Sequence, residues 1–327
     1  MSTSMPEFQL THPRSIADAL AARVQHPASR FIAGGTDLLV NMRHGLNSPD
    51  LLIDLSGIEE LSELQVSDNG LRVGAGVTIA ALARNPVVAS DYRAVVQAAE
   101  GIAGPGHRAM GTLGGNLCLD TRCIFYNQSE WWRRANEFCL KSRGDICHVA
   151  PQGQRCHAAF TGDLAPALLA LGADAEIAGK NGRRRLPLGK LYVEDGRAHL
   201  RLADDELIIA VQLPRPPGPS AYSKVRVRGA IDYPLAGVAV VLSAAAGIVK
   251  SLRIGLTGTN SRPFVLAGTD AIVGRQIDES ALQEIDRLVQ KQVQPMRTTV
   301  AAAQYRRLAA AALACRLTAS LFAEQQS

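Results

Sequence analysis

The chain of 327 residues is 47% hydrophobic and 20% charged, and its net charge of +5 comes from basic residues scattered among acidic ones. This composition predicts a globular protein of two or three domains and disfavours a nucleic-acid-binding surface. No apolar run approaches the ~20 residues of a membrane-spanning helix, and the N-terminal segment lacks the basic and apolar regions of a secretory signal, so we expect a cytoplasmic protein.

The first part of the chain alternates strand and helix patterns. Short apolar runs predict strands over 7–10, 31–33 and 51–55, and apolar residues at helical spacing predict helices over 15–24 and 94–103. Thr78 is a candidate N-cap for another helix over 79–83. This mixture of elements predicts an α+β protein.

The second part of the chain returns to this texture beyond residue 162. A helix is predicted over 166–171, strands over 173–178, 208–213, 221–227, 236–246 and 251–257, and helices over 280–292 and 298–318. The proline-rich segment 214–219 is unable to continue a sheet. We therefore expect one region over 1–216, with subdomains of about 1–56 and 57–216, and a C-terminal domain over 217–327.

Two glycine-rich loops are candidates for binding a diphosphate. Ala33-Gly-Gly-Thr-Asp37 follows a predicted strand, and Gly111-Thr-Leu-Gly-Gly-Asn116 lies farther along the chain. Paired glycines let the backbone turn tightly and present successive N–H groups, and Thr36 adds a hydroxyl donor. Neither loop is the dinucleotide fingerprint or a P-loop. Each alone is typical of a tight turn, but together they predict a site that holds one diphosphate from both sides.

Five of the six cysteines lie in one stretch that also contains both tryptophans, and they are Cys118, Cys123, Cys139, Cys147 and Cys156. Without a secretory signal, such a cluster favours metal ligation over disulfides. Four thiolates suit either an iron–sulfur cluster or tetrahedral zinc. The close C-x-x-C pairs of zinc sites are absent, which favours iron and sulfide, but spacing alone leaves both readings open.

Other residues of this stretch have plainer interpretations. Cys118 is expected to be a spare, buried thiol. His148 and His157 flank two of the cysteines and could replace a thiolate, although we favour four sulfur ligands. Trp131 and Trp132 are expected to pack as a small core.

Four segments resemble those of a known family, and they are Ile32-Ala-Gly-Gly-Thr-Asp-Leu38, Thr112-Leu-Gly-Gly-Asn116, Asp163-Leu-Ala-Pro166 and Asp232-Tyr-Pro-Leu-Ala-Gly-Val238. They resemble the FAD-binding medium subunits of the xanthine oxidase family of molybdenum hydroxylases. The resemblance covers nearly the whole chain. It implies a FAD-binding region of two subdomains, similar to that of vanillyl-alcohol oxidase, and a small C-terminal α+β domain of the CO dehydrogenase flavoprotein type.

The resemblance also implies which residues bind FAD. Those that match the diphosphate-binding positions are Ala33, Gly34, Gly35, Thr36, Asp37, Thr112, Gly115 and Asn116. Asp163 matches an aspartate near the adenosine part, and Lys224 matches a lysine near the flavin. No catalytic residue is expected on this chain, because the cofactors carry the chemistry.

Residues 118–161 form an insertion of roughly forty residues where most such subunits have a short connection, and unstructured loops of that length usually have a function. The insertion makes the chain resemble most closely the β subunits of 4-hydroxybenzoyl-CoA reductases, which hold an added 4Fe-4S cluster through four cysteines. The ligands that this resemblance implies are Cys123, Cys139, Cys147 and Cys156.

The same resemblance implies partners and a direction of electron flow. The partners would be a molybdopterin-binding large subunit and a small subunit with two 2Fe-2S clusters, in a heterohexamer of two αβγ units. Binding to a membrane or to a nucleic acid is not expected. Electrons would pass from ferredoxin through the 4Fe-4S cluster and FAD to the small subunit and molybdenum, where 4-hydroxybenzoyl-CoA would be reduced to benzoyl-CoA.

Three alternatives stay open at this point. The chain could be the FAD subunit of an oxidising hydroxylase, of the xanthine, aldehyde or CO dehydrogenase type, with a structural zinc loop. It could instead be a stand-alone flavin oxidase, although no compact constellation of histidine, carboxylate or tyrosine supports that reading. A third alternative is a binding module with a zinc loop and no flavin.

Overall fold

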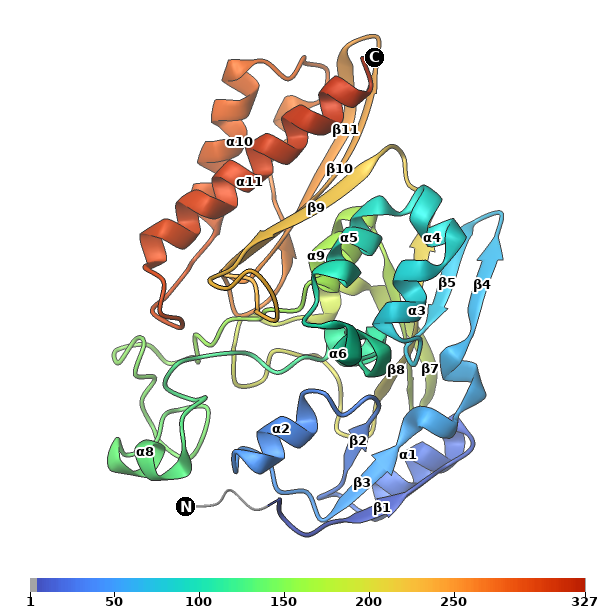
Figure 1. Cartoon of the computed structure of the whole chain (residues 1–327), viewed down its shortest axis with the longest axis vertical. Helices are drawn as coiled ribbons and strands as arrows, with labels where there is room; N and C mark the ends of the chain where they lie inside the picture. The colour runs from blue at the N-terminus through green and yellow to red at the C-terminus, as the bar shows by residue number, and fades with distance from the viewer. Residues whose placement is uncertain (1–4, 327) are drawn as a thin grey trace.

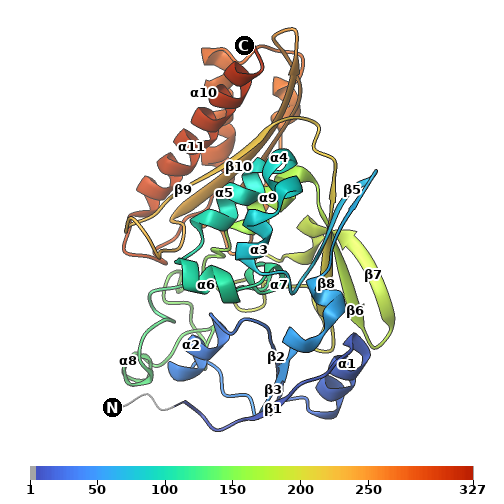
Figure 2. The same cartoon turned by 45° about the vertical axis from the view of Figure 1, so that its right-hand side comes forward.

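Three β-sheets follow one another along the long axis of the molecule in the computed structural model, which describes residues 5–326 (Figures 1 and 2). The N-terminal sheet is parallel, in the order β1-β3-β2. Its strands are β1 (Gln9–Thr11), β2 (Arg30–Ile32) and β3 (Leu51–Asp54), and its helices are α1 (Ile16–Gln25) and α2 (Leu38–Arg43). The Ser15 side chain caps α1 by accepting from the amide of Asp18.

The middle sheet is antiparallel, in the order β4-β5-β8-β6-β7. Its strands are β4 (Leu64–Ser67), β5 (Gly70–Gly74), β6 (Asp174–Gly179), β7 (Gly182–Pro187) and β8 (Leu207–Pro214). The helices beside it are α3 (Ile79–Arg84), α4 (Pro86–Asp91), α5 (Arg93–Gly101), α6 (Pro105–Met110), α7 (Leu113–Leu117) and α9 (Leu164–Leu171). Chain segments far apart in sequence therefore build one layer.

The C-terminal sheet is antiparallel, in the order β12-β11-β10-β9, and two long helices cover one of its faces (Figure 1). The strands are β9 (Ser220–Val225), β10 (Ala236–Ala245), β11 (Ile248–Thr257) and β12 (Phe264–Val265), and the helices are α10 (Glu279–Gln292) and α11 (Ala303–Glu324). The described residues of the predicted 1–216 region hold the first two sheets and those of 217–327 hold the third. Residues 1–4 and 327 of these ranges lie outside the described residues.

Helix α9 lies between the middle and C-terminal sheets, and all eight of its residues are buried. It is apolar on every side, as expected for a helix with no solvent-facing surface. A Cβ atom on Gly255 of β11 would lie 2.1 Å from the carbonyl oxygen of Pro166, so glycine is needed where this strand approaches the helix. The hydrophobic core around α9 also includes Ala239 and Val241 of β10.

The insertion projects to one side of the sheets as turns and one short helix, α8 (Glu130–Ala135) (Figure 1). Its two ends are joined by backbone hydrogen bonds between Arg122 and Ala159. Its amide at Ile124 donates to the carbonyl oxygen of Thr298 in the C-terminal domain. The insertion is therefore closed at its neck and bonded to the C-terminal domain.

The α+β prediction is confirmed, and most predicted elements lie within two or three residues of the observed ones. The predicted helix over 298–318 is displaced, because α11 begins at Ala303 and ends at Glu324. The segment before it is held out of the helix by other contacts, since the carbonyl oxygens of Met296 and Thr298 accept from Arg306 and Ile124. Within residues 5–326 no helix combines the length and apolarity needed to span a membrane.

Arg306 on α11 is completely buried and holds the C-terminal domain together through oxygen acceptors from three segments. It donates to the carbonyl oxygens of Leu235, Gly258 and Met296 and to the Thr298 hydroxyl. Arg306→Met should lower the free energy of unfolding by at least about 3 kcal/mol, because several buried acceptors lose their donor. Urea unfolding of the purified protein measures this loss. Arg316→Met, on an exposed position of the same helix, is the control and should have little effect.

Candidate cofactor site

The first glycine loop connects β2 to α2 and presents unpaired backbone donors. Gly35 has a φ of +67°, which glycine adopts without strain. The amide groups of Gly34, Gly35 and Thr36 have no hydrogen-bond partner among residues 5–326, and the loop is only half-buried. Successive free N–H groups of this kind form an anion-binding nest.

The second glycine loop lies directly against the first. A Cβ atom on Gly34 would lie 1.9 Å from the carbonyl oxygen of Met110 and 2.9 Å from the amide nitrogen of Gly111. The hydroxyl oxygen of Thr36 is 3.4 Å from the position that a Cβ on Gly111 would occupy. The two predicted loops thus meet in backbone contact, although one belongs to the first sheet and the other to the helices beside the second.

The second loop differs from the first in that the protein already uses most of its amides. The amides of Gly111, Leu113, Gly114 and Asn116 donate to His107, Val77, Ala75 and Thr112, and that of Gly115 donates to the Thr112 hydroxyl oxygen. This loop therefore shapes one wall of the site and offers side chains, while the first loop offers free N–H groups.

Asn116 links the second loop to the next predicted residue. Its side-chain oxygen accepts from the amide of Leu164, at the start of α9. Asp163 precedes that residue, is buried, and accepts at 2.6 Å from the hydroxyl of Tyr222 on β9. Lys224, two residues farther along the same strand, places its Nζ 2.8 Å from the same carboxylate oxygen. The predicted cofactor residues therefore form one continuous line of contacts.

Asp163 and Lys224 form a buried ion pair. Burial raises the pKa of the Asp163 carboxyl, and the neighbouring Lys224 ammonium opposes that shift. The two side chains therefore form one buried polar pair. The assignments of Asp163 to the adenosine part and of Lys224 to the flavin stay predictions.

Tyr222 is a site residue that the sequence did not reveal. A Cβ atom on Gly237 would lie 2.6 Å from its hydroxyl oxygen, so the glycine of the Asp232–Val238 segment makes room for it. The carbonyl oxygen of Asp232 accepts from Lys224. The segment therefore supports the Asp163 contact from the neighbouring strand β10. A tyrosine two residues before Lys224, and so on the same face of a strand, was the available signal.

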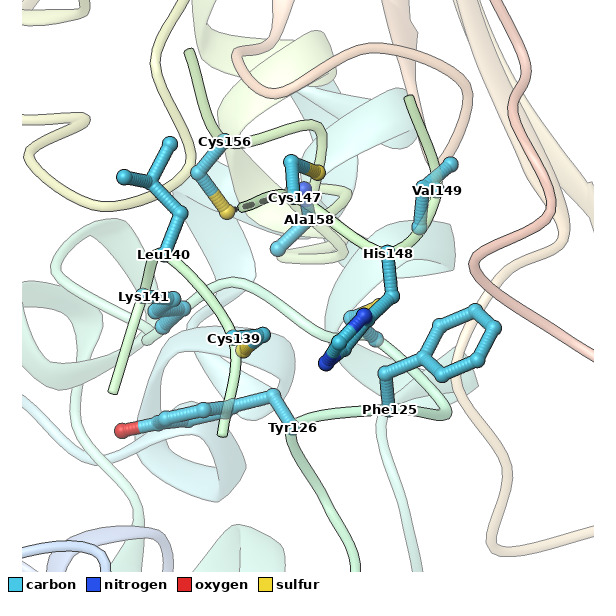
Figure 3. Close-up of a pocket in the computed structure, with 11 residues that line it drawn as sticks. Phe125, Tyr126, Cys139, Leu140, Lys141, Cys147, His148, Val149, Cys156 and Ala158 are labelled. Carbon is cyan, nitrogen blue, oxygen red and sulfur yellow. Dashed lines mark hydrogen bonds between the residues drawn. The ribbon is translucent and has the colours of Figure 1, made fainter. Parts of the chain in front are cut away.

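The four predicted metal ligands line one small pocket inside the insertion (Figure 3). Cys123, Cys139, Cys147 and Cys156 share it with Phe125, Tyr126, Leu140, Lys141, His148, Val149 and Ala158. All four cysteines are free thiols and are buried. In the described part of the chain, no three His, Cys, Asp or Glu side chains are arranged to hold a single metal ion. The sulfur atoms therefore surround a space without converging on one point.

The pocket combines thiols in close contact with a buried cation. The Cys156 thiol donates to Cys147, which lowers the pKa of Cys147 to about 4, whereas burial raises the pKa of Cys123 to about 11. Lys141 is buried, and its Nζ lies 2.6 Å from a carboxylate oxygen of Asp120 and 4.7 Å from the centre of the Tyr126 ring. It also donates to Gly196 and Thr121. The cation thus ties the insertion to the body of the protein.

The spare cysteine, one histidine and the two tryptophans of the insertion differ in position and exposure. Cys118 lies outside the pocket, at the end of α7, and packs against the core of the middle sheet. A ring nitrogen of His148 lies 2.6 Å from the carbonyl oxygen of Phe138. Trp132 is partly buried near Phe125, with ring centroids 6.3 Å apart, but Trp131 is 71% exposed. The prediction that both tryptophans pack in a core is therefore wrong for Trp131.

Comparison with known proteins agrees with these features. Residues 6–216 match the family described as the FAD binding domain in molybdopterin dehydrogenase, and residues 220–321 match the CO dehydrogenase flavoprotein C-terminal domain. The chain is 32% identical over 278 residues to the FAD-binding subunit of an aldehyde oxidoreductase from Escherichia coli (strain K12), which is 82% of this chain and 86% of that protein. It is 27% identical to the carbon monoxide dehydrogenase medium chain of Afipia carboxidovorans, over 302 residues and 91% of each chain.

A solved structure extends the likeness to three dimensions. A chain of the CO dehydrogenase from Oligotropha carboxidovorans superposes with a TM-score of 0.81 at 26% sequence identity, over 98% of this chain and 99% of that one.

The backbone contact between the loops gives a direct test of the cofactor site. Gly34→Ala should reduce FAD affinity at least about tenfold, because the added Cβ would push Met110 away and separate the two loops. FAD content of the purified protein and fluorescence titration of the flavin-free protein measure this effect. Gly106→Ala is the matched control, since nothing lies within 4 Å of its Cβ position. Normal FAD affinity in Gly34→Ala would contradict the assignment.

A buried histidine beneath the insertion should make stability depend on pH. Burial lowers the pKa of His199 to about 4, whereas the unfolded chain binds that proton near 6.5. The folded protein should therefore lose up to about 3 kcal/mol of stability from this group as the pH falls from 6.5 to 4. His199→Phe, which can pack against Phe160, should remove this loss in urea unfolding at pH 7 and pH 4.5, and exposed His26→Phe should not.

Proposed function

Because this chain belongs to the FAD-binding subunits of the molybdenum hydroxylase family, we propose that it is the subunit through which electrons enter a reductive member of that family. In this proposal the subunit carries FAD and a 4Fe-4S cluster. Bound together, these groups supply one- and two-electron transfer, and the chain's own residues hold, space and tune them.

The observation that carries the proposal is the cysteine-lined pocket in the insertion. Cys123, Cys139, Cys147 and Cys156 come from separate turns, yet all four line one buried space. A multi-iron cluster binds each thiolate through a different iron atom, so its ligands surround a volume. A single zinc ion would instead bind all four thiolates at one point, with Zn–S bonds of about 2.3 Å, and no three such side chains among residues 5–326 are arranged in that way. Four thiols around one buried space therefore fit the cluster as a donor set.

The FAD site is proposed to follow the line of contacts between the two loops and β9. The free amides of Gly34, Gly35 and Thr36 would bind the diphosphate, with Ala33 and Asp37 completing that loop. Thr112, Gly115 and Asn116 would form the opposite wall. Asp163 is proposed to lie near the adenosine part and Lys224 near the flavin. The proposed division into 1–216 and 217–327 places this site where the two regions meet.

We propose that the whole complex removes the phenolic hydroxyl of 4-hydroxybenzoyl-CoA. In the balanced reaction, 4-hydroxybenzoyl-CoA, two electrons and two protons give benzoyl-CoA and water, and reduced ferredoxin supplies the electrons. The partners are a molybdopterin-binding large subunit and a small subunit with two 2Fe-2S clusters, in a heterohexamer. Relatives named as medium chains or FAD-binding subunits support such an assembly. Free thiols support a cytoplasmic location, where they stay reduced.

The first experiment is metal analysis and low-temperature EPR of the anaerobically purified complex, before and after reduction. About four iron and four sulfide per FAD, beyond those of the small subunit, with an added EPR signal on reduction, are expected. Reduction of the flavin by reduced ferredoxin would support the inward direction. Zinc in the insertion would instead indicate an oxidising hydroxylase with a structural zinc loop. Substrate oxidation by the isolated chain would indicate a stand-alone flavin oxidase, and a colourless protein would indicate a binding module.

Matched cysteine variants localise the cluster. Cys139→Ser should abolish the added EPR signal and lower the iron content by up to about four per chain, because the cluster loses a thiolate ligand. Cys118→Ser, which changes a thiol outside the pocket, should leave both unchanged. An unchanged signal in Cys139→Ser, or equal losses in both variants, would refute the proposed ligand set.

A further inference from the structure

We propose that Arg122, which pairs with Ala159 at the neck of the insertion, is a positioning residue for FAD that neutralises Asp37 of the diphosphate-binding loop. Its guanidinium forms an ion pair with the Asp37 carboxylate. It also donates to the side-chain oxygen of Asn41 at 3.4 Å and to the hydroxyl of Tyr233 at 2.9 Å. The inference rests on the assignment of residues 33–37 to FAD made above, but it does not depend on the nature of the metal site.

The first glycine loop contains groups that attract an anion and one group that repels it. Three free amides of the loop favour an anion, but the carboxylate of Asp37, at the end of the same loop, repels one. Among residues 5–326, the basic side chain within ion-pairing distance of Asp37 is that of Arg122. The side chains are only 15% and 25% exposed, so solvent screens the pair weakly. Arg122 therefore converts an unfavourable loop into one that accepts a diphosphate.

The guanidinium is held in place from several directions. Its backbone pairs with Ala159 through two hydrogen bonds, at 2.7 and 2.8 Å, where the insertion begins and ends. Its planar group lies 4.8 Å from the centre of the Tyr233 ring, which is a cation–π distance. Asn41 is buried and donates to the second oxygen of Asp37, so the carboxylate is also fixed in orientation. One side chain thus joins the first sheet, the insertion and the C-terminal domain.

This arrangement makes the FAD loop depend on the insertion. Arg122 immediately precedes the proposed ligand Cys123, and the two share the same buried neck. Loss of order in the insertion would withdraw the positive charge from Asp37. The site would then expose an uncompensated carboxylate to the diphosphate.

The test uses the assembled complex and compares FAD affinity by fluorescence titration after removal of the flavin. Arg122→Gln should weaken FAD binding at least about tenfold, because a buried charge-assisted contact is lost. Asp37→Asn added to Arg122→Gln should recover most of that loss, since the repelling charge is gone. Arg215→Gln, at a 71% exposed arginine, is the control and should bind FAD normally.

The recovery distinguishes charge compensation from a general structural role, because a second substitution does not repair a misfolded insertion. FAD affinity of Arg122→Gln within about twofold of the unsubstituted protein, or no recovery in the double variant, would overturn the inference. Where Arg122→Gln fails to assemble, Arg122→Lys should retain FAD affinity within about threefold, and a tenfold loss in it would also count against the inference. Normal affinity in Gly34→Ala would instead overturn the loop assignment itself.

Discussion

The cofactor site depends on one close contact between backbones, that of Gly34 with the carbonyl of Met110 and the amide of Gly111. Any side chain larger than hydrogen at residue 34 would separate the two loops. The second loop uses most of its amides within its own turns and for the segment that follows β5, and the first loop keeps its amides free. The contact thus brings the free amides of the first loop beside the second loop, whose Asn116 bonds to the start of α9.

The sequence predicted the parts of the site that are local. Glycine pairs, a following helix and an adjacent hydroxyl lie within a few residues of one another, so the amino-acid order alone was enough to find both loops. The contacts of Asp163 with Tyr222 and Lys224, and of Arg122 with Asp37, join segments 59 to 85 residues apart. No local pattern encodes such distances. The direct contact between Asp163 and Lys224 is an example, because matching residues to a family one at a time does not reveal it.

The sequence also predicted only part of the structure of the insertion. The type and number of its cysteines pointed to a metal site, and these four do line one pocket. The position of Lys141 beside them was not visible, because a lysine in a charged stretch usually faces solvent. Its burial is possible because Asp120, Thr121 and Gly196 supply oxygen acceptors, and Tyr126 supplies a ring face. The exposed position of Trp131 was missed for the complementary reason, since tryptophan is usually buried.

Helix α9 limits how the two segments of this protein can be recombined with those of other proteins. It belongs in sequence to the matched segment 6–216, yet it packs on β10 and β11 of the segment 220–321, and one hydrophobic core includes residues of both. Separating the two segments would expose one side of a helix that is apolar all round. Recombination at that boundary therefore preserves a stable protein only if the exchanged partner offers a strand surface that fits α9, including a glycine where Gly255 meets Pro166. The two segments are separate in sequence but are stabilised as one folded unit.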